Sequence, residues 1–309
     1  MLLVMFWNVE NFFDTYDNPY RNDDEFTPMG ENHWTAANFN QKRDDLAKTI
    51  SLAADKYGDF PALVGLCEVE NAYVLNQLAN NTPLARIGYG FIHRESPDSR
   101  GIDVALLYRK DTFTPLEKRF YKADFPTREI LYAKGVVNTL DTVHILVNHW
   151  PSKSGGEKSS EPKRIAVANL AKGIADSLLA ANPNAAIIMM GDLNDTPSSK
   201  SLKHMLGDQE NLVNLTPFAT GEKGTYKYRG DWQSIDHFIV SRSFLGPKES
   251  IMPQWLYCRE EMEIFAPDFL LEWDNTYMGV KPRRTYQGPR YLGGVSDHLP
   301  ILLKVYGQK

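Results

Sequence analysis

Polar side chains that could do chemistry follow a short apolar run near the middle of the chain. Asp192 and Asn194 come directly after residues 185–190, a run short enough to be a buried strand. Residues two apart in an extended segment point to the same side, so we expect both side chains to act on one ligand atom. Gly191 would let that ligand approach the backbone. The same residue types also favour turns, so this pair alone does not define a site.

Two more polar residues follow apolar runs in the first quarter of the chain. Glu68 comes after residues 62–67, and Asn8 comes after the N-terminal run that ends at Trp7. An acid at a strand end can also cap the next helix, so position alone leaves both interpretations of Glu68 open. Hard divalent cations prefer carboxylate and amide oxygens, and Mg²⁺ keeps several of its waters. One Glu beside one Asn or Asp therefore suits a sparse Mg²⁺ site.

A first acid–histidine pair is predicted from His149 and Asp103. His149 ends the apolar run 143–148, and Asp103 is the candidate to orient it. A carboxylate beside an imidazole raises the pKa of the imidazole and fixes its tautomer.

A second pair is predicted near the C-terminus. His298 precedes the apolar run 299–303, and Asp297 and Asp236 supply two more carboxylates. If Ile235 faces the core, Asp236 faces the other way. Two acid–histidine pairs beside a metal site suit phosphate-ester hydrolysis. That reaction needs charge neutralisation, water activation and protonation of the leaving group.

Length and composition set the broad class. The 309 residues are expected to form one domain, 1–309, with a large core. A net charge of −5 gives no strong basic field, which counts weakly against nonspecific duplex binding but is compatible with a metal-dependent enzyme. Two cysteines make no disulfide framework, and Cys67 is expected to be a small buried hydrophobe. The sequence has no transmembrane run and no complete signal peptide, so the compartment, cytoplasmic or secreted, stays open.

Strands interspersed with helices predict an α/β fold whose sheets are covered by helices. Helical apolar spacing is found over residues 39–53 and 165–178, with Pro162 opening the second stretch, and a third helix is expected near Ser198. The segments 14–34, 152–161 and 251–294 are expected to be irregular. Apolar strand candidates end at Trp7, Cys67, Tyr108, Asn148, Met190 and Val240, and one more starts at Leu299.

Seven short stretches together resemble the endonuclease/exonuclease/phosphatase family, which includes deoxyribonuclease-I-like enzymes. Each stretch is weak alone, but the set occurs in the family's order and spans nearly the whole chain. The resemblance implies a four-layer α/β/β/α sandwich with two packed mixed sheets, whose site loops gather at one sheet edge. The stretches are 6–11 (FWNVEN), 66–71 (LCEVEN), 101–106 (GIDVAL), 148–151 (NHWP), 191–195 (GDLND), 235–238 (IDHF) and 296–300 (SDHLP).

The resemblance also implies roles for the matching residues. Glu68 would be the central metal ligand, with Asn8 and Asp297 beside it. Asp192 would orient or deprotonate the attacking water, and Asn194 would hold a phosphate oxygen. His298, paired with Asp236, would polarise the phosphate. His149, paired with Asp103, would donate a proton to the leaving oxygen. Abasic-site endonucleases generally lack this second histidine, so its presence favours the deoxyribonuclease and phosphatase branches.

Candidate substrate contacts lie in two places. Lys153 belongs to the donor-rich segment 152–158, which could wrap a phosphate or be a solvated loop. Arg283 and Arg284 stand just upstream of Asp297. They belong to a mixture of cations and aromatics that could stack bases or pack ordinary loops: Tyr226, Tyr228, Arg229, Trp232, Arg283, Arg284, Tyr286, Arg290 and Tyr291.

These observations favour a hydrolase of phosphate esters that depends on Mg²⁺ or Mn²⁺, with Ca²⁺ as a candidate second ion. The expected activity is that of a phosphodiesterase or endonuclease on DNA or RNA, through water activated by the metal and Asp192. A phosphatase or a phospholipid or inositol-phosphate hydrolase on the same fold is the alternative, since fold does not fix substrate. A non-catalytic binding protein is disfavoured because no expected catalytic position is lost. No obligate protein partner is evident.

Overall fold

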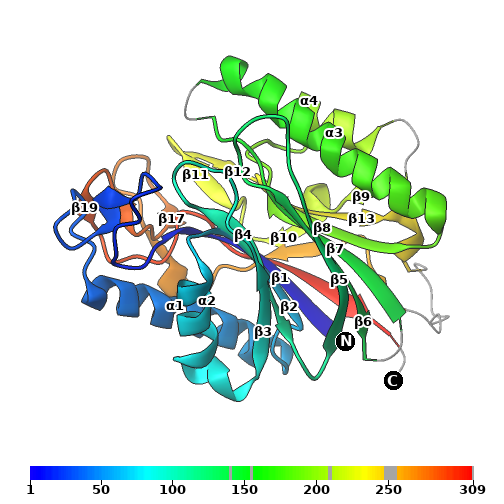
Figure 1. Ribbon diagram of the computed structural model, residues 1–309, viewed down its shortest axis with the longest axis horizontal. Helices are drawn as coiled ribbons and strands as arrows, with labels where there is room; N and C mark the ends of the chain where they lie inside the picture. Colours follow the sequence, from blue (N-terminus) through cyan, green and yellow to red (C-terminus); the bar gives the residue numbers. More distant parts are fainter. Residues whose placement is uncertain (139–140, 154–155, 208–210, 247–255, 308–309) are drawn as a thin grey trace.

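Two β-sheets lie face to face at the centre of the protein, with helices on both outer sides (Figure 1). The computed structural model describes residues 1–138, 141–153, 156–207, 211–246 and 256–307. Two large mixed sheets between helical layers confirm the predicted α/β/β/α sandwich. Among the described residues, no helix is long and apolar enough to cross a membrane.

The first sheet contains the chain's N-terminal strand at its centre. Its order is β10-β15-β20-β1-β2-β4-β3, and β14 also pairs with β20. β1 and β2 are parallel, whereas β20 and β4 run antiparallel to them. The strands are β1 (Leu2–Phe12), β2 (Leu63–Val69), β3 (Tyr89–His93), β4 (Asp103–Arg109), β10 (Ala219–Gly221), β14 (Tyr257–Cys258), β15 (Met262–Ile264) and β20 (Ile301–Tyr306).

The second sheet has the order β5-β6-β7-β8-β13-β9, with β7 and β8 parallel. Buried apolar side chains of the two sheets interlock between them. Gly65 of β2 is needed there, because a Cβ atom at this position would lie 2.7 Å from Sδ of Met190 on β8. The strands are β5 (Phe113–Tyr121), β6 (Ile130–Val137), β7 (Asp141–His149), β8 (Ala186–Asp192), β9 (Leu212–Asn214) and β13 (Asp236–Ser241).

Helices α1 (Ala36–Tyr57) and α2 (Ala72–Asn80) flank the first sheet, and α3 (Glu157–Ala181) and α4 (Lys200–Leu206) flank the second (Figure 1). Thr35 and Asn71 cap α1 and α2 by accepting backbone N–H groups. Short 3₁₀ turns are η1 (Asp24–Phe26), η2 (Pro83–Arg86), η3 (Thr216–Phe218), η4 (Arg242–Phe244) and η5 (Asp268–Leu270). Three two-stranded ribbons are β11 (Tyr226–Tyr228) with β12 (Asp231–Gln233), β16 (Leu271–Trp273) with β17 (Val280–Pro282), and β18 (Tyr286–Gln287) with β19 (Arg290–Tyr291).

Helices are present at the three predicted places, over residues 39–53, after Pro162 and near Ser198. α1 extends beyond the predicted range at both ends, α3 begins earlier than predicted, and α2 is an additional helix. α3 begins at Glu157, so Pro162 lies inside it, and part of the segment expected to be irregular is helical. α2 was not predicted, although its residues Val74, Leu75, Leu78 and Ala79 form a buried apolar face at helical spacing. The segment 251–294 carries short strands and ribbons over its described part. Residues 154–155 and 251–255 of the segments expected to be irregular lie outside the described residues.

Strand direction brings the predicted site residues to one edge of the sandwich. β1, β2, β7 and β8 all end there, and the antiparallel strand β13 begins there. Asp192 stands opposite His149 on one side and opposite Asp236 on the other. The polar residues that follow separate strands in the sequence thus lie together in one cluster.

Candidate active site

Asn8, where the regular pairing of β1 with β2 is interrupted, joins carboxylates from both sheets. Its Nδ2 donates to Oδ2 of Asp192 at 3.0 Å and lies 3.3 Å from Oε1 of Glu68. Its Oδ1 accepts the backbone N–H of Glu10 at 2.9 Å, which fixes the orientation of the amide. The amide nitrogen of Asn8 thus faces and positions the two carboxylates, and the role of Asn8 as a metal ligand stays a prediction.

Glu68 is the more open of these two carboxylates. The pairing of β2 shifts register between Cys67 and Val69, and Glu68 adopts a left-handed φ of 62°. This local bulge re-aims the side chain at the sheet edge. Oε2 accepts the N–H of Asn11 at 2.9 Å, and the side chain stays 15% exposed, against 2% for Asp192. Glu68 is thus held in place and still accessible to a ligand.

The predicted pairing of His298 with Asp236 is confirmed. Nδ1 of His298 lies 2.8 Å from Oδ2 of Asp236, and Nε2 lies 3.8 Å from Oδ2 of Asp192. The ring also packs against Tyr226, with centroids 5.0 Å apart. Burial would lower the pKa of His298, but the charges of Asp236 and Asp192 outweigh it and raise the pKa well above its ordinary value. The two carboxylates therefore favour the protonated form of this imidazole.

The predicted hydrogen bond between His149 and Asp103 is absent. Nδ1 of His149 and Oδ2 of Asp103 are both buried without a hydrogen-bond partner, and Oδ1 of Asp103 accepts the N–H of Ser96 at 3.0 Å. Burial, then the charges of Arg128 and Arg100, lower the pKa of His149 well below its ordinary value. The prediction of a carboxylate that raises this pKa is wrong, and the surroundings of His149 favour its neutral form.

Asp192 and Asn194 meet through a turn and not along a strand. β8 ends at Asp192, and Asn194 has a left-handed φ of 53°. Its N–H donates to Oδ1 of Asp192 at 2.8 Å, and its Nδ2 donates to the carbonyl of Trp150 at 3.0 Å. Burial raises the pKa of Asp192 to about 7. The space beside Gly191 is filled by Asn148, so this glycine serves strand packing and not the approach of a ligand.

A buried ion network adjoins these carboxylates, and two of its members were not predicted. Glu10 is buried and accepts the N–H of Thr285 at 2.7 Å, and burial raises its pKa to about 7. Lys42 of α1 is buried too and donates to the carbonyl of Glu10 and to Oγ1 of Thr285. Nη2 of Arg284 lies 3.4 Å from Oε1 of Glu10 and 3.2 Å from Oδ2 of Asp297. The network fixes Arg284 and Asp297 beside the site.

The other two predicted substrate contacts have partners elsewhere. Arg283 donates to the carbonyl of Gly293 at 2.8 Å and so closes its own loop. Nζ of Lys153 lies 3.1 Å from carboxylate oxygens of both Asp195 and Glu157. Of the three predicted cations, Arg284 alone contacts a carboxylate assigned to the metal site.

A hollow of about 260 Å³ lies directly beside Asp297 and Arg284. Its walls are two ribbons, held together by an ion pair of 3.0 Å between the buried side chains of Lys227 and Asp274. The lining includes Tyr226, Tyr228, Arg229, Tyr277 and Lys281. In contrast, Tyr286 and Tyr291 of the same predicted mixture pack against Trp34 in the core.

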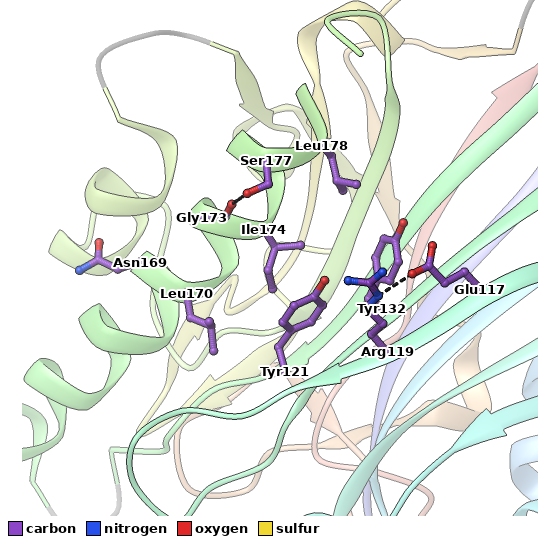
Figure 2. Close-up of a pocket in the computed structure, with 10 residues that line it drawn as sticks. All are labelled: Glu117, Arg119, Tyr121, Tyr132, Asn169, Leu170, Gly173, Ile174, Ser177 and Leu178. Carbon is purple, nitrogen blue, oxygen red and sulfur yellow. Dashed lines mark hydrogen bonds and ion pairs between the residues drawn. The ribbon is translucent and has the colours of Figure 1, made fainter. Parts of the chain in front are cut away.

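A larger hollow, of about 470 Å³, lies between α3 and the edge of the second sheet (Figure 2). Leu170, Ile174 and Leu178 line it from the helix. Tyr121, Tyr132 and the Glu117–Arg119 ion pair line it from β5 and β6. None of the predicted site residues lines this hollow. The volume of a hollow is therefore not a guide to the catalytic site in this protein.

The chain belongs to the endonuclease/exonuclease/phosphatase family, whose sequence profile matches residues 3–307. A search of curated proteins found no match. Similar solved structures include a mannosyl-6-phosphatase from Bacteroides thetaiotaomicron, with 16% identity, a TM-score of 0.62, and coverage of 99% of this chain and 100% of that one. A humanized Danio rerio TDP2 has 14% identity and a TM-score of 0.59, and the match covers 99% of each chain. The human Nocturnin catalytic domain has 14% identity and a TM-score of 0.59, and the match covers 99% of this chain and 94% of that one. At these identities the structures show a shared fold.

His237 illustrates a histidine beside the site that serves the fold. Next to Asp236, it points away from it: Nε2 donates to the carbonyl of Asp195 at 2.8 Å, and Nδ1 accepts from Thr216 at 2.9 Å. Burial lowers the pKa of His237 to about 4. Protonation therefore favours the unfolded chain, where the pKa is near 6.5.

We expect this histidine to make folding stability fall as the pH drops from about 6.5 to about 4, by about 3 kcal/mol in all. Urea unfolding at several pH values should show a smaller fall for His237→Gln than for the natural protein. His204→Gln, at an exposed position, is the control and should leave the slope unchanged. Identical pH dependence in His237→Gln and the natural protein would contradict the assignment.

Proposed function

We propose that the protein hydrolyses phosphodiesters, including those of nucleic acid, with a divalent cation bound at Glu68 and Asp297. The observation that carries this proposal is the convergence of an open carboxylate, Glu68, with the buried pair of Asp192 and His298. Membership of the family, whose enzymes act on phosphate esters, supports the same reaction class.

The donor set suits a hard cation such as Mg²⁺ or Mn²⁺, with Ca²⁺ as a candidate second ion. Glu68 is 15% exposed and Asp297 is 21% exposed, so both carboxylates are accessible to a cation. The buried carboxyls of Asp192 and Glu10 have raised pKa values, so added positive charge is favourable there. When bound, the cation would neutralise charge on the phosphate and lower the pKa of a water.

The chain's own residues supply the remaining steps. Asp192, held by Asn8 and the N–H of Asn194, takes the proton of the attacking water. Its pKa of about 7 is near the optimum for a general base at neutral pH. His298, kept protonated by Asp236, directs Nε2–H at a non-bridging phosphate oxygen. Asn194 holds a second oxygen of the phosphate.

The balance of charge favours a diester over a monoester. Arg284 is already matched by Glu10 and Asp297, and Lys153 by Asp195 and Glu157. A monoester carries up to two negative charges and needs more free cations than a diester, which carries one. The hollow beside Asp297 can accept one ester group, and its tyrosines offer faces on which a nucleobase can stack.

Phosphomonoester hydrolysis is the second candidate. The same hollow, at about 260 Å³, could hold a single sugar-sized group, and one protein of similar fold is titled a mannosyl-6-phosphatase. A phospholipid or inositol phosphate is a further substrate of this class to test.

Hydrolysis of paired substrates tests the proposal. With Mg²⁺, kcat/KM for bis-(p-nitrophenyl) phosphate should exceed that for p-nitrophenyl phosphate, and plasmid DNA should be cut. An inositol phosphate and a sphingolipid complete the panel. Glu68→Gln should lower the rate roughly 100-fold or more, because metal charge stabilisation is worth several kcal/mol. Glu261→Gln, partly exposed beside Lys304, is the matched control and should leave the rate unchanged.

Full activity in excess chelator, or wild-type turnover in Glu68→Gln, would overturn the metal assignment. Preference for the monoester would replace the first candidate with the second.

His149 can be tested by the leaving group of the substrate. Since burial favours the neutral form of its imidazole and Asp103 does not hydrogen-bond to it, we expect His149 to stabilise the leaving oxygen by a hydrogen bond, while solvent water supplies the proton that this oxygen takes up. His149→Ala should therefore cost roughly 10²–10³-fold on both a nitrophenyl diester and an alkyl diester. His144→Ala, on the same strand, is the control. A much larger loss on the alkyl diester would restore the proton-donor role that the sequence suggested.

A further inference from the structure

Cys67 lies directly behind the proposed catalytic carboxylates. Its Sγ, a ring nitrogen of His149 and a carboxylate oxygen of Asp192 lie within 4.8 Å of one another. The cysteine comes from β2 of the first sheet, whereas the other two residues end β7 and β8 of the second. All three are buried. The packing of the two sheets thus brings together a sulfur, a nitrogen and an oxygen donor.

The imidazole of His149 is held near these donors without a hydrogen bond. Nε2 lies 3.7 Å from Oδ2 of Asp192 and 3.9 Å from Oε1 of Glu68, too far for hydrogen bonds. Nδ1 has no partner. Of the two ring nitrogens, Nε2 is the one that faces the carboxylates of Asp192 and Glu68, so a cation held at this cluster would bind to Nε2.

The donor set distinguishes between two kinds of cation. Mg²⁺ prefers oxygen ligands and gains nothing from a thiolate. Zn²⁺ binds Cys, His and Asp at about 2.0–2.3 Å in a tetrahedron, and a three-residue set with an open fourth position is common. Small movements of the three side chains would bring their donors to that spacing.

We propose that Cys67, His149 and Asp192 form a second cation site, selective for Zn²⁺ and similar thiophilic ions, that overlaps the catalytic site. A cation bound there occupies the carboxylate oxygen of Asp192 that would otherwise accept a proton from water. Zn²⁺ at this site therefore inhibits hydrolysis supported by Mg²⁺. The inhibition rests on the proposed function, whereas the binding does not.

Co²⁺ absorption tests the binding directly, since a cobalt–thiolate bond gives a charge-transfer band in the near ultraviolet. The full chain should develop this band on addition of Co²⁺ and lose it when Zn²⁺ is added. Cys67→Ser should show no band and should bind Zn²⁺ roughly 10–100-fold more weakly. Cys67→Ala gives the same test with an apolar side chain, in case a buried hydroxyl disturbs folding.

Cys258→Ser is the matched control. Cys258 is also buried, but its partner in the sheet is at the level of Leu2, whereas Cys67 stands opposite Asn8, about 20 Å further along β1. This variant should keep the band. A natural protein without the band, a band that survives in Cys67→Ser and Cys67→Ala, or a band lost in Cys258→Ser would overturn the proposal.

Inhibition is measured separately. Zn²⁺ should block hydrolysis supported by Mg²⁺ in the natural protein and in Cys258→Ser at the concentrations that displace Co²⁺. Cys67→Ser should need at least about tenfold more Zn²⁺. If no substrate is hydrolysed, the proposed function fails while the absorption band still decides the binding. If hydrolysis occurs but the band is missing, the second cation site alone fails.

Discussion

The amide of Asn8 is the contact on which the geometry of the site depends. It lies at the end of the two sheets, where its nitrogen reaches carboxylates that belong to different sheets, Glu68 and Asp192. The N–H of Glu10 holds the amide oxygen and prevents rotation. The packing of the sheets sets the separation of the two carboxylates, and Asn8 fixes their orientation. A change in the face-to-face packing would therefore disturb the chemistry before it exposed the core.

Buried negative charge is the second constraint on this edge of the sandwich. Several carboxylates converge where strands end, and the cations of the chain compensate them unequally. His298 compensates the charge of Asp236, and Arg284 and Lys42 compensate the charge of Glu10. Glu68 is partly exposed, and within the described part of the chain its carboxylate accepts hydrogen bonds from amide groups alone, those of Asn8 and Asn11. A divalent cation at that position would complete the balance, so the charge distribution itself argues for metal dependence.

The sequence predicted the layers and much of the cluster, because strand ends and polar residues are local features. The pairing of His298 with Asp236 was predicted correctly, whereas the pairing of His149 with Asp103 was not. Spacing along the chain does not show which side chains from different strands come within hydrogen-bond distance. Glu10 and Lys42 were missed for a related reason: one lies within a strand and the other within a helix stripe, and only the packing of α1 brings them together. The sequence left both an extended segment and a turn open at Asn194, and the left-handed backbone there shows that the turn is adopted.

We propose that Glu68 binds the catalytic cation while Asn8 and Asp192 shape the rest of the site. A crystal structure of the protein soaked with Mn²⁺, with the metal located from its anomalous scattering, tests this most directly. We expect a peak bonded to a carboxylate oxygen of Glu68, with the amide nitrogen of Asn8 still directed at Asp192. A well-ordered site without a peak at Glu68 in millimolar Mn²⁺, or a peak bonded to the side chain of Asn8, would contradict it.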